Sequence, residues 1–462
     1  MDHPWLMRWL AQRLVLLQNS SQKLHDHSEN GDEIMTASAF GSRIRGAIFI
    51  VAIASFAPLA SAEPAVKDII KTYGDLAAAK YGDALAKARD LDKAIDSFIA
   101  APSADTLKAA RAAWKASRDP YMQTEGFRFG NKIVDDWEGN VNAWPLDEGL
   151  IDYVDTASYG EKKDENPLYA ANIIANPSLQ LGANKLDAKT IDKDVIASLN
   201  SALDVEANVG TGYHAIEFLL WGQDLNGTNA GAGNRPATDY DVKACTGGNC
   251  ERRRAYLKSA SQLLIDDLTT MVETWKVGGP ARKAITDQND NQQLQVILTG
   301  LGSLSYGELA GERMKLGVLL HDPEEEHDCF SDNTHNSHYY DQVGMISIWN
   351  GNYEGATPVK GASVAELARA KNPEAAKRVD DAMATALAKL KAIKDKADSG
   401  DMAYDQMLAA GNDAGNKMIL DAVDALVAQA RAIEGVVAAL KLQIKIEGSD
   451  SLDNPSAVGA AE

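Results

Sequence analysis

Basic residues are too few in this chain to balance its acidic ones. The 462 residues include 46 lysines and arginines against 66 aspartates and glutamates, which gives a net charge of −20. A surface this acidic repels phosphate backbones, so the charge argues against nucleic acid as a partner. It attracts cations instead, although net charge alone does not locate a binding site.

Cysteine is scarce, with three in the whole chain. Cys245 and Cys250 bracket a short Thr-Gly-Gly-Asn turn, and this spacing predicts a local disulfide in an exported protein. A metal site built on thiolates would need more cysteines nearby. Cys329 is left over, either free or paired between molecules.

An apolar stretch near the N-terminus, GAIFIVAIASFAPLASA, is shorter than the ~20 residues that span a bilayer. It follows two arginines and ends in small residues at Ala62, which predicts a signal peptide over residues 35–62. The alternative is an N-terminal membrane anchor. Residues 1–34 form a polar lead that we expect to be disordered or non-native. The mature protein is then exported, and no cysteine that could carry a lipid anchor follows the signal segment.

Convincing runs of strand-like alternation are also missing. Apolar residues instead recur at three- and four-residue steps, which predicts amphipathic helices. Ser103 suits the start of one helix, and Pro120 is expected to interrupt it after about residue 118. Alanine-rich helices of this length pack as antiparallel bundles, so the fold class is all-α. The expected helices cover residues 65–99, 103–118, 251–276, 292–319, 363–398 and 413–443.

Polar segments rich in glycine, asparagine and proline separate these helices. Long loops are expected over residues 130–195, 223–250 and 321–361. The length of the chain favours two helical-bundle domains with long irregular loops between helices. We expect an N-terminal domain over 63–232, a C-terminal domain over 233–446 and a disordered tail over 447–462.

One histidine lies within an apolar run, in GTGYHAIEFLLWG at residues 210–222. His214 and Glu217 are three residues apart and share a helix face, so both can point at one metal ion. Gly212 permits a sharp backbone turn before the helix. A carboxylate in apolar surroundings is costly unless it is paired or binds a cation. The alternative is a buried hydrogen-bonded pair that only fixes packing.

The phrase GYHAIEFLLWGQD, followed by GNRPATDY, resembles the imelysin family, whose hallmark is G-x-H-x-x-E. The stretches WPLDEGLIDY, SYGELAGERM and EEEHDCFSDNTHNSHYYD are similar to this family too. The resemblance implies an exported, all-helical protein with two bundle-like domains. It also implies a link to iron, because some members are iron-regulated and relatives serve in periplasmic iron uptake. The family was classed among metallopeptidases.

Carboxylates elsewhere are candidates to complete a metal site with His214 and Glu217. Glu125 ends an R-x-x-Y-x-x-x-E run that is similar to a segment of iron-uptake relatives, and Asp147 lies in WPLDEG. Carboxylates with one imidazole suit iron best, with zinc or copper as alternatives. Each carboxylate could equally be a solvated surface group.

The segment 321–341 is a second candidate metal site, or a lid over the first one. It is dense in histidine and carboxylate side chains, and it could also be a solvated loop. Its histidines are His321, His327, His335 and His338.

Three functions follow from these patterns. The first is a periplasmic or outer-membrane-associated metal-binding protein in iron acquisition or homeostasis, with other exported iron-uptake proteins as partners. The second is a metal-dependent peptidase using Glu217, although the H-E-x-x-H run of many zinc peptidases is absent. The third is a helical interaction module without a metal.

Overall fold

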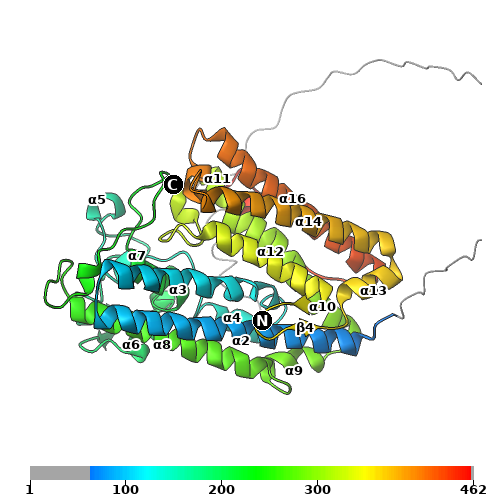
Figure 1. Cartoon of the computed structure of the whole chain (residues 1–462), viewed down its shortest axis with the longest axis horizontal. Coiled ribbons are helices and arrows are strands. Elements are labelled where there is room, and N and C mark those ends of the chain that lie inside the picture. Colours follow the sequence, from blue (N-terminus) through cyan, green and yellow to red (C-terminus); the bar gives the residue numbers. More distant parts are fainter. Residues whose placement is uncertain (1–62, 459–462) are drawn as a thin grey trace, which may run out of the picture. The chain divides into compact units, whose positions relative to one another are not determined.

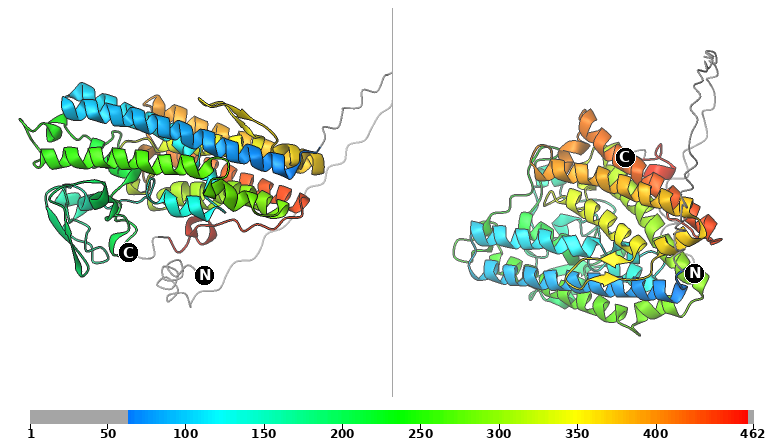
Figure 2. Two further views of the ribbon diagram at one scale, coloured as in Figure 1. Left: turned by 90° about the horizontal axis from the view of Figure 1, so that it is seen from below. Right: turned by 45° about the vertical axis from the view of Figure 1, so that its right-hand side comes forward.

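The computed structural model describes residues 63–458. Three long helices form one bundle: α2 (Val66–Ala100), α3 (Ala104–Met122) and α8 (Cys250–Trp275) (Figure 1). Helix α2 packs against both α3 and α8, and Figure 2 shows α2 beside α8 in both views. The buried side chains of α2, among them Ile69, Tyr73 and Leu76, recur at the spacing that its sequence predicts.

Helix α3 starts where its sequence predicts and ends later. The Ser103 hydroxyl accepts a hydrogen bond from the backbone N–H of Thr106, and this caps the helix. Pro120 lies inside α3, which continues to Met122 rather than being interrupted after residue 118. The proline sits in the last turn, where few intrahelical hydrogen bonds remain to be lost.

A second bundle contains α14 (Pro373–Asp398), α16 (Asp413–Ala439) and η5 (Leu304–Lys315), a π-helical segment. Helix α16 packs against both α14 and η5. Helix α10 (Asp290–Ser303) contacts α16 on one side and α2 on the other, so it joins the two groups (Figure 1). The all-α expectation is confirmed, with helices arranged as bundles.

Helix α12 (Thr334–Asn350) corrects the expected loop over 321–361. It packs between the bundles, against α14 and α3. Most of its residues are buried, among them His338, Asp341 and Gln342. Because its polar residues are buried as well, the helix lacks the division into an apolar and a polar face that marks helices in sequence.

Shorter elements connect these helices. Two antiparallel hairpins pair β1 (Ser178–Leu181) with β2 (Asn184–Asp187) and β3 (Asn352–Tyr353) with β4 (Val359–Lys360), so strand structure is present but minor. The remaining short helical elements are η1 (Glu125–Phe127), α4 (Lys132–Glu138), η2 (Glu148–Leu150), α5 (Thr156–Tyr159), α6 (Lys193–Ala197), η3 (Ala202–Asp204), α7 (Gly212–Trp221), η4 (Ala237–Tyr240), α9 (Pro280–Thr286), α11 (Leu316–Leu320), η6 (Pro323–Glu325), α13 (Val364–Lys371), α15 (Tyr404–Leu408) and α17 (Asp450–Asp453).

The described residues belong to one compact unit. Helix α8, on the C-terminal side of the expected boundary between 232 and 233, packs against α2 and α7 on its N-terminal side. That boundary stays a prediction. The expected lead (1–34) and signal peptide (35–62) lie outside the described residues. Within 63–458, no helix is both long enough and apolar enough to cross a membrane.

The described part of the C-terminal segment, residues 447–458, is structured and includes α17, contrary to the disorder expected there. It packs against η5, where the hydroxyl of Ser451 donates to the carbonyl of Gly311 at 2.8 Å. A Cβ atom on Gly307 would lie 2.5 Å from the carbonyl oxygen of Glu447, and one on Gly311 would lie still closer to Ser449. Glycines on η5 therefore make room for the tail.

Candidate metal centre

Helix α7 carries His214 and Glu217 in the interior, and every residue from Gly212 to Trp221 is buried. Gly212 has a φ of +79°, and a Cβ atom there would lie 2.4 Å from the carbonyl oxygen of Val141. Only glycine fits this close approach in a left-handed backbone conformation. The sharp turn before the helix is therefore present as the sequence predicts.

His214 and Glu217 face each other, with Nδ1 of His214 2.9 Å from Oε2 of Glu217. The other carboxylate oxygen of Glu217 accepts a hydrogen bond from the backbone N–H of Ser331 at 3.0 Å. Nε2 of His214 is buried and has no hydrogen-bond partner among the described residues. A histidine held by a carboxylate at one nitrogen, with the other nitrogen free, is typical of a metal ligand with its outer-shell partner.

Two residues from the segment before α12 complete a cluster with His214. Ligand atoms of His214, His327 and Asp328 all lie within 4.8 Å of one another, and the three side chains are buried. The ring centroids of His214 and His327 are 4.9 Å apart. We call His214, His327 and Asp328 the histidine cluster. The sequence points to His327, and to Asp328 among the carboxylates of that segment, only as part of a second site or a lid.

Arg118 of α3 holds Asp328 in place. Its Nη2 donates to Oδ1 of Asp328 at 2.8 Å, and its Nη1 donates to Oδ1 of Asn142 at 2.5 Å. The hydroxyl of Ser337 and the side-chain amide of Asn333 donate to the other oxygen of Asp328. Arg118 belongs to the R-x-x-Y-x-x-x-E run, and it is the arginine rather than Glu125 that contacts the cluster.

The electrostatics leave two neutral imidazoles beside one ionised carboxylate. Burial, with Arg118 second, lowers the pKa of His214 to about 3. Burial and then Arg313 also lower the pKa of His327 well below its usual range. Burial alone would raise the pKa of Asp328, but Arg118, His214 and the hydrogen bonds from Ser337 and Asn333 together outweigh it and bring that pKa to about 2. Neutral imidazole and ionised carboxylate are the forms that ligate metals.

This donor set fits a metal ion. Two imidazole nitrogens and one carboxylate are the set used by non-haem iron(II) sites, and zinc and copper also accept it. The unpartnered Nε2 of His214 is the buried polar atom that such an ion would satisfy. Burial, and then the charge of Asp328, raise the pKa of Glu217 well above its usual range, which a nearby cation would offset. Arg118 already supplies part of that positive charge.

Glu125 and Asp147 lie outside the histidine cluster. Oε2 of Glu125 pairs with Arg313 at 2.7 Å, within a buried network that also holds Glu308 and Asp341. Asp147 accepts a hydrogen bond from the Asn166 side chain at 2.6 Å. These partners take up the two carboxylates that the sequence offered as completing ligands.

The other histidines of the 321–341 segment are spread over different surroundings. Nδ1 of His321 lies 2.7 Å from the carbonyl oxygen of Leu408, and Nε2 of His335 lies 3.0 Å from Asp398. His338 is buried on α12, with no hydrogen-bond partner on either ring nitrogen among residues 63–458. The disulfide joins Cys245 to Cys250 as their spacing predicts, and Cys329 is free.

Comparison with known proteins assigns this chain to a family. The family model described as Imelysin matches residues 77–433, a range that contains the G-x-H-x-x-E motif and the whole histidine cluster. The chain belongs to the imelysin family. The resemblance carried by the G-x-H-x-x-E motif is thereby confirmed, and this imelysin-family chain has its motif histidine in a buried cluster.

Individual relatives agree with this assignment. Iron-regulated protein A of Synechococcus elongatus is 39% identical over 71 residues, which is 15% of this chain and 20% of that protein. An iron-regulated protein A precursor of Parabacteroides distasonis has a similar structure, with a TM-score of 0.58, 18% identity and coverage of 82% of this chain and 96% of that one. An imelysin-like protein of Psychrobacter arcticum also has a similar structure, with a TM-score of 0.53, 16% identity and coverage of 83% of this chain and 99% of that one. The two structures support the fold alone.

Proposed function

We propose that this protein binds an iron ion at His214, His327 and Asp328 and acts in iron acquisition or homeostasis. The observation that carries the proposal is the buried, unpartnered Nε2 of His214 beside a second imidazole and an ionised carboxylate. Glu217 is an outer-shell partner that orients His214 rather than a ligand. Arg118 positions Asp328. The negative charge of Asp328 would then interact with both Arg118 and the bound ion.

Iron is favoured over zinc and copper by two independent lines. The donor set of two histidines and one carboxylate is typical of iron(II) sites with open positions. The similar protein of Synechococcus elongatus carries the name iron-regulated protein A. The curated match spans about a fifth of that relative's length, so its name supports the proposal without assigning a role.

We further propose that the protein works outside the cytoplasm, in the periplasm or at the outer membrane. The signal-type segment at 35–62 supports export. The disulfide between Cys245 and Cys250 suits an oxidising compartment. Its partners would then be other exported iron-uptake proteins.

The geometry favours metal binding over the two alternatives. A metallopeptidase needs an open coordination position and a general base that reaches water. Glu217 is 0% exposed, and its two oxygens are engaged by His214 and Ser331. A pair that only fixed packing would not need a second imidazole and a carboxylate within 4.8 Å of its histidine.

Anaerobic calorimetry of the purified full chain with iron(II), followed by zinc(II) and copper(II), tests the proposal. We expect one ion per chain and a loss of affinity in His214→Ala, His327→Ala and Asp328→Asn. The loss should exceed the roughly 10- to 100-fold that removal of an outer-shell partner costs. His321→Ala, which changes an exposed histidine outside the cluster, is the control. An absence of iron binding, or wild-type affinity in His214→Ala, would overturn the proposal.

A further inference from the structure

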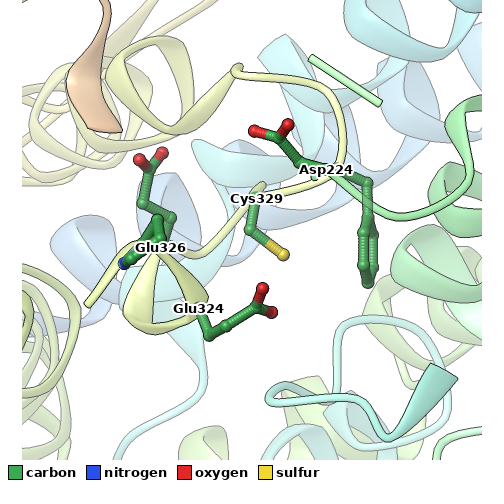
Figure 3. A pocket seen from close by; sticks show the side chains of 6 residues that line it. Asp224, Glu324, Glu326 and Cys329 are labelled. Atoms are coloured by element: carbon green, nitrogen blue, oxygen red, sulfur yellow. The ribbon is translucent and has the colours of Figure 1, made fainter. Parts of the chain in front are cut away.

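Three segments that are distant in sequence bring carboxylates together at one point of the fold. Asp224 follows α7, Asp332 precedes α12 and Asp405 lies in α15, and carboxylate oxygens of the three lie within 4.8 Å of one another. Glu324 and Glu326 line an adjoining hollow with Asp224 and Cys329 (Figure 3). We call Asp224, Asp332 and Asp405 the acidic loop cluster.

The charge of this cluster is not compensated within the fold. None of the five carboxylates forms an ion pair with a lysine, arginine or histidine among residues 63–458. Asp405 is 2% exposed and Glu326 is 1% exposed, and none of their four carboxylate oxygens has a hydrogen-bond partner in good geometry among the described residues. Burying carboxylates without partners is costly, so a missing positive charge is the simplest explanation.

The pKa values agree with this geometry. Burial, and then the charge of Asp332, raise the pKa of Asp405 to about 7. Burial, and then Asp224, raise the pKa of Asp332 to about 6, although Lys115 acts in the opposite direction. Mutual repulsion between these groups is what a bound cation would remove.

We propose that Asp224, Asp332 and Asp405 form a second cation site, for a hard divalent ion of the Ca²⁺ class, with Glu326 beside it. All the donors are oxygens on separate segments, and Ca²⁺ accepts several carboxylates in flexible geometry, whereas Mg²⁺ keeps most of its water.

This site differs from the proposed iron site in its ligands, and it does not depend on that proposal. The two sites are nevertheless close in sequence, because Asp332 lies four residues after Asp328 and Asp224 follows the helix that carries His214. A cation at the acidic loop cluster would tie α7, the segment before α12 and α15 together. The segment that supplies His327 and Asp328 would become more rigid as a result.

Thermal unfolding of the full chain in excess chelator, in Ca²⁺ and in Mg²⁺ tests the site. We expect saturating Ca²⁺ to raise the Tm by a few degrees, because a ligand that binds only the folded state stabilises it. Mg²⁺ should have a smaller effect. The same rise should persist in His214→Ala, which separates this site from the proposed iron site.

Matched variants locate the effect. Asp405→Asn and Asp224→Asn should lose the response to Ca²⁺ and, in chelator, unfold at the wild-type Tm or above it because repulsion is relieved. Asp401→Asn is the control, since Asp401 is exposed and pairs with Lys396 at 3.3 Å. An unchanged wild-type Tm in Ca²⁺, or a full response in both cluster variants, would overturn the proposal. Stabilisation by Zn²⁺ alone that is lost in Cys329→Ser would overturn it as well.

Discussion

The backbone N–H of Ser331 donates to Oε1 of Glu217 at 3.0 Å, which ties the segment before α12 to helix α7. The same carboxylate holds Nδ1 of His214 through its other oxygen. One side chain thus fixes both the orientation of the motif histidine and the position of the segment that brings in His327 and Asp328. The second half of the G-x-H-x-x-E motif is an organiser of the cluster.

Replacing Glu217 with glutamine should weaken metal binding without unfolding the protein. A neutral amide still accepts from Ser331 but interacts less strongly with His214, so iron(II) affinity should fall roughly 10- to 100-fold. Calorimetry measures the affinity, and circular dichroism checks the fold. Glu374→Gln, at an exposed position of α14, is the control. Wild-type affinity in Glu217→Gln would rule out the orienting role.

Gly212→Ala should destabilise the protein. The new Cβ atom would meet the carbonyl of Val141 at 2.4 Å, and alanine is strained at a φ of +79°. We expect a loss of about 1–3 kcal/mol or more in denaturant unfolding. Gly82→Ala in α2 is the matched control, because its Cβ atom would meet nothing within 4 Å. That change should stabilise the protein by about 0.5–1 kcal/mol, and equal losses in the two variants would contradict the prediction.

Arg313→Leu should be among the most damaging single changes. Arg313 is 2% exposed and pairs with Glu125, Glu308 and Asp341, which would be left without this cation. Breaking a buried pair from one side typically costs about 3–5 kcal/mol. Lys417→Ala removes an exposed pair with Asp421 and should cost less than about 1 kcal/mol. Urea unfolding compares them, and similar losses would show that the buried network is dispensable.

Buried Lys80 should make the free energy of unfolding increase as the pH rises above 7. Burial lowers its pKa to about 7, although Asp83 acts in the opposite direction. Between pH 7 and its ordinary pKa, the unfolded chain binds a proton that the folded one lacks, so this lysine's contribution to stability rises with pH. Lys80→Met should therefore be more stable relative to wild type at pH 6.5 than at pH 9.5.

Thermal or urea unfolding across this range measures that difference. Lys67→Met, at an exposed position near the start of α2, controls for the loss of a lysine. The gap between Lys80→Met and wild type should narrow as the pH rises. A gap that stays constant would mean that Lys80 is charged in the folded protein throughout the range.

Local relationships were predictable from the sequence, and distant ones were not. His214 and Glu217 share a helix face because they are three residues apart, and Cys245 and Cys250 are close enough to pair through a short turn. The meeting of His327 with His214 depends on how the segment before α12 lies against α7. No periodicity encodes that packing.

Two sequence-based expectations, for α12 and for Glu125, share one physical difficulty. The sequence predicts a loop at α12 because its buried residues include His338, Asp341 and Gln342. No apolar stripe therefore marks the helix in the sequence. Glu125 was offered as a ligand because a carboxylate in sequence does not reveal Arg313 at 2.7 Å. In both cases a tertiary partner reverses what composition alone suggests.

The seating of the C-terminal segment on η5 bears on how the protein can be shortened. A version that stops at residue 446 would lack the residues that pack on Gly307 and Gly311, and the backbone of η5 would be exposed to water there. Trimming what composition marks as a dispensable end would then loosen η5, which packs against α10 and α16.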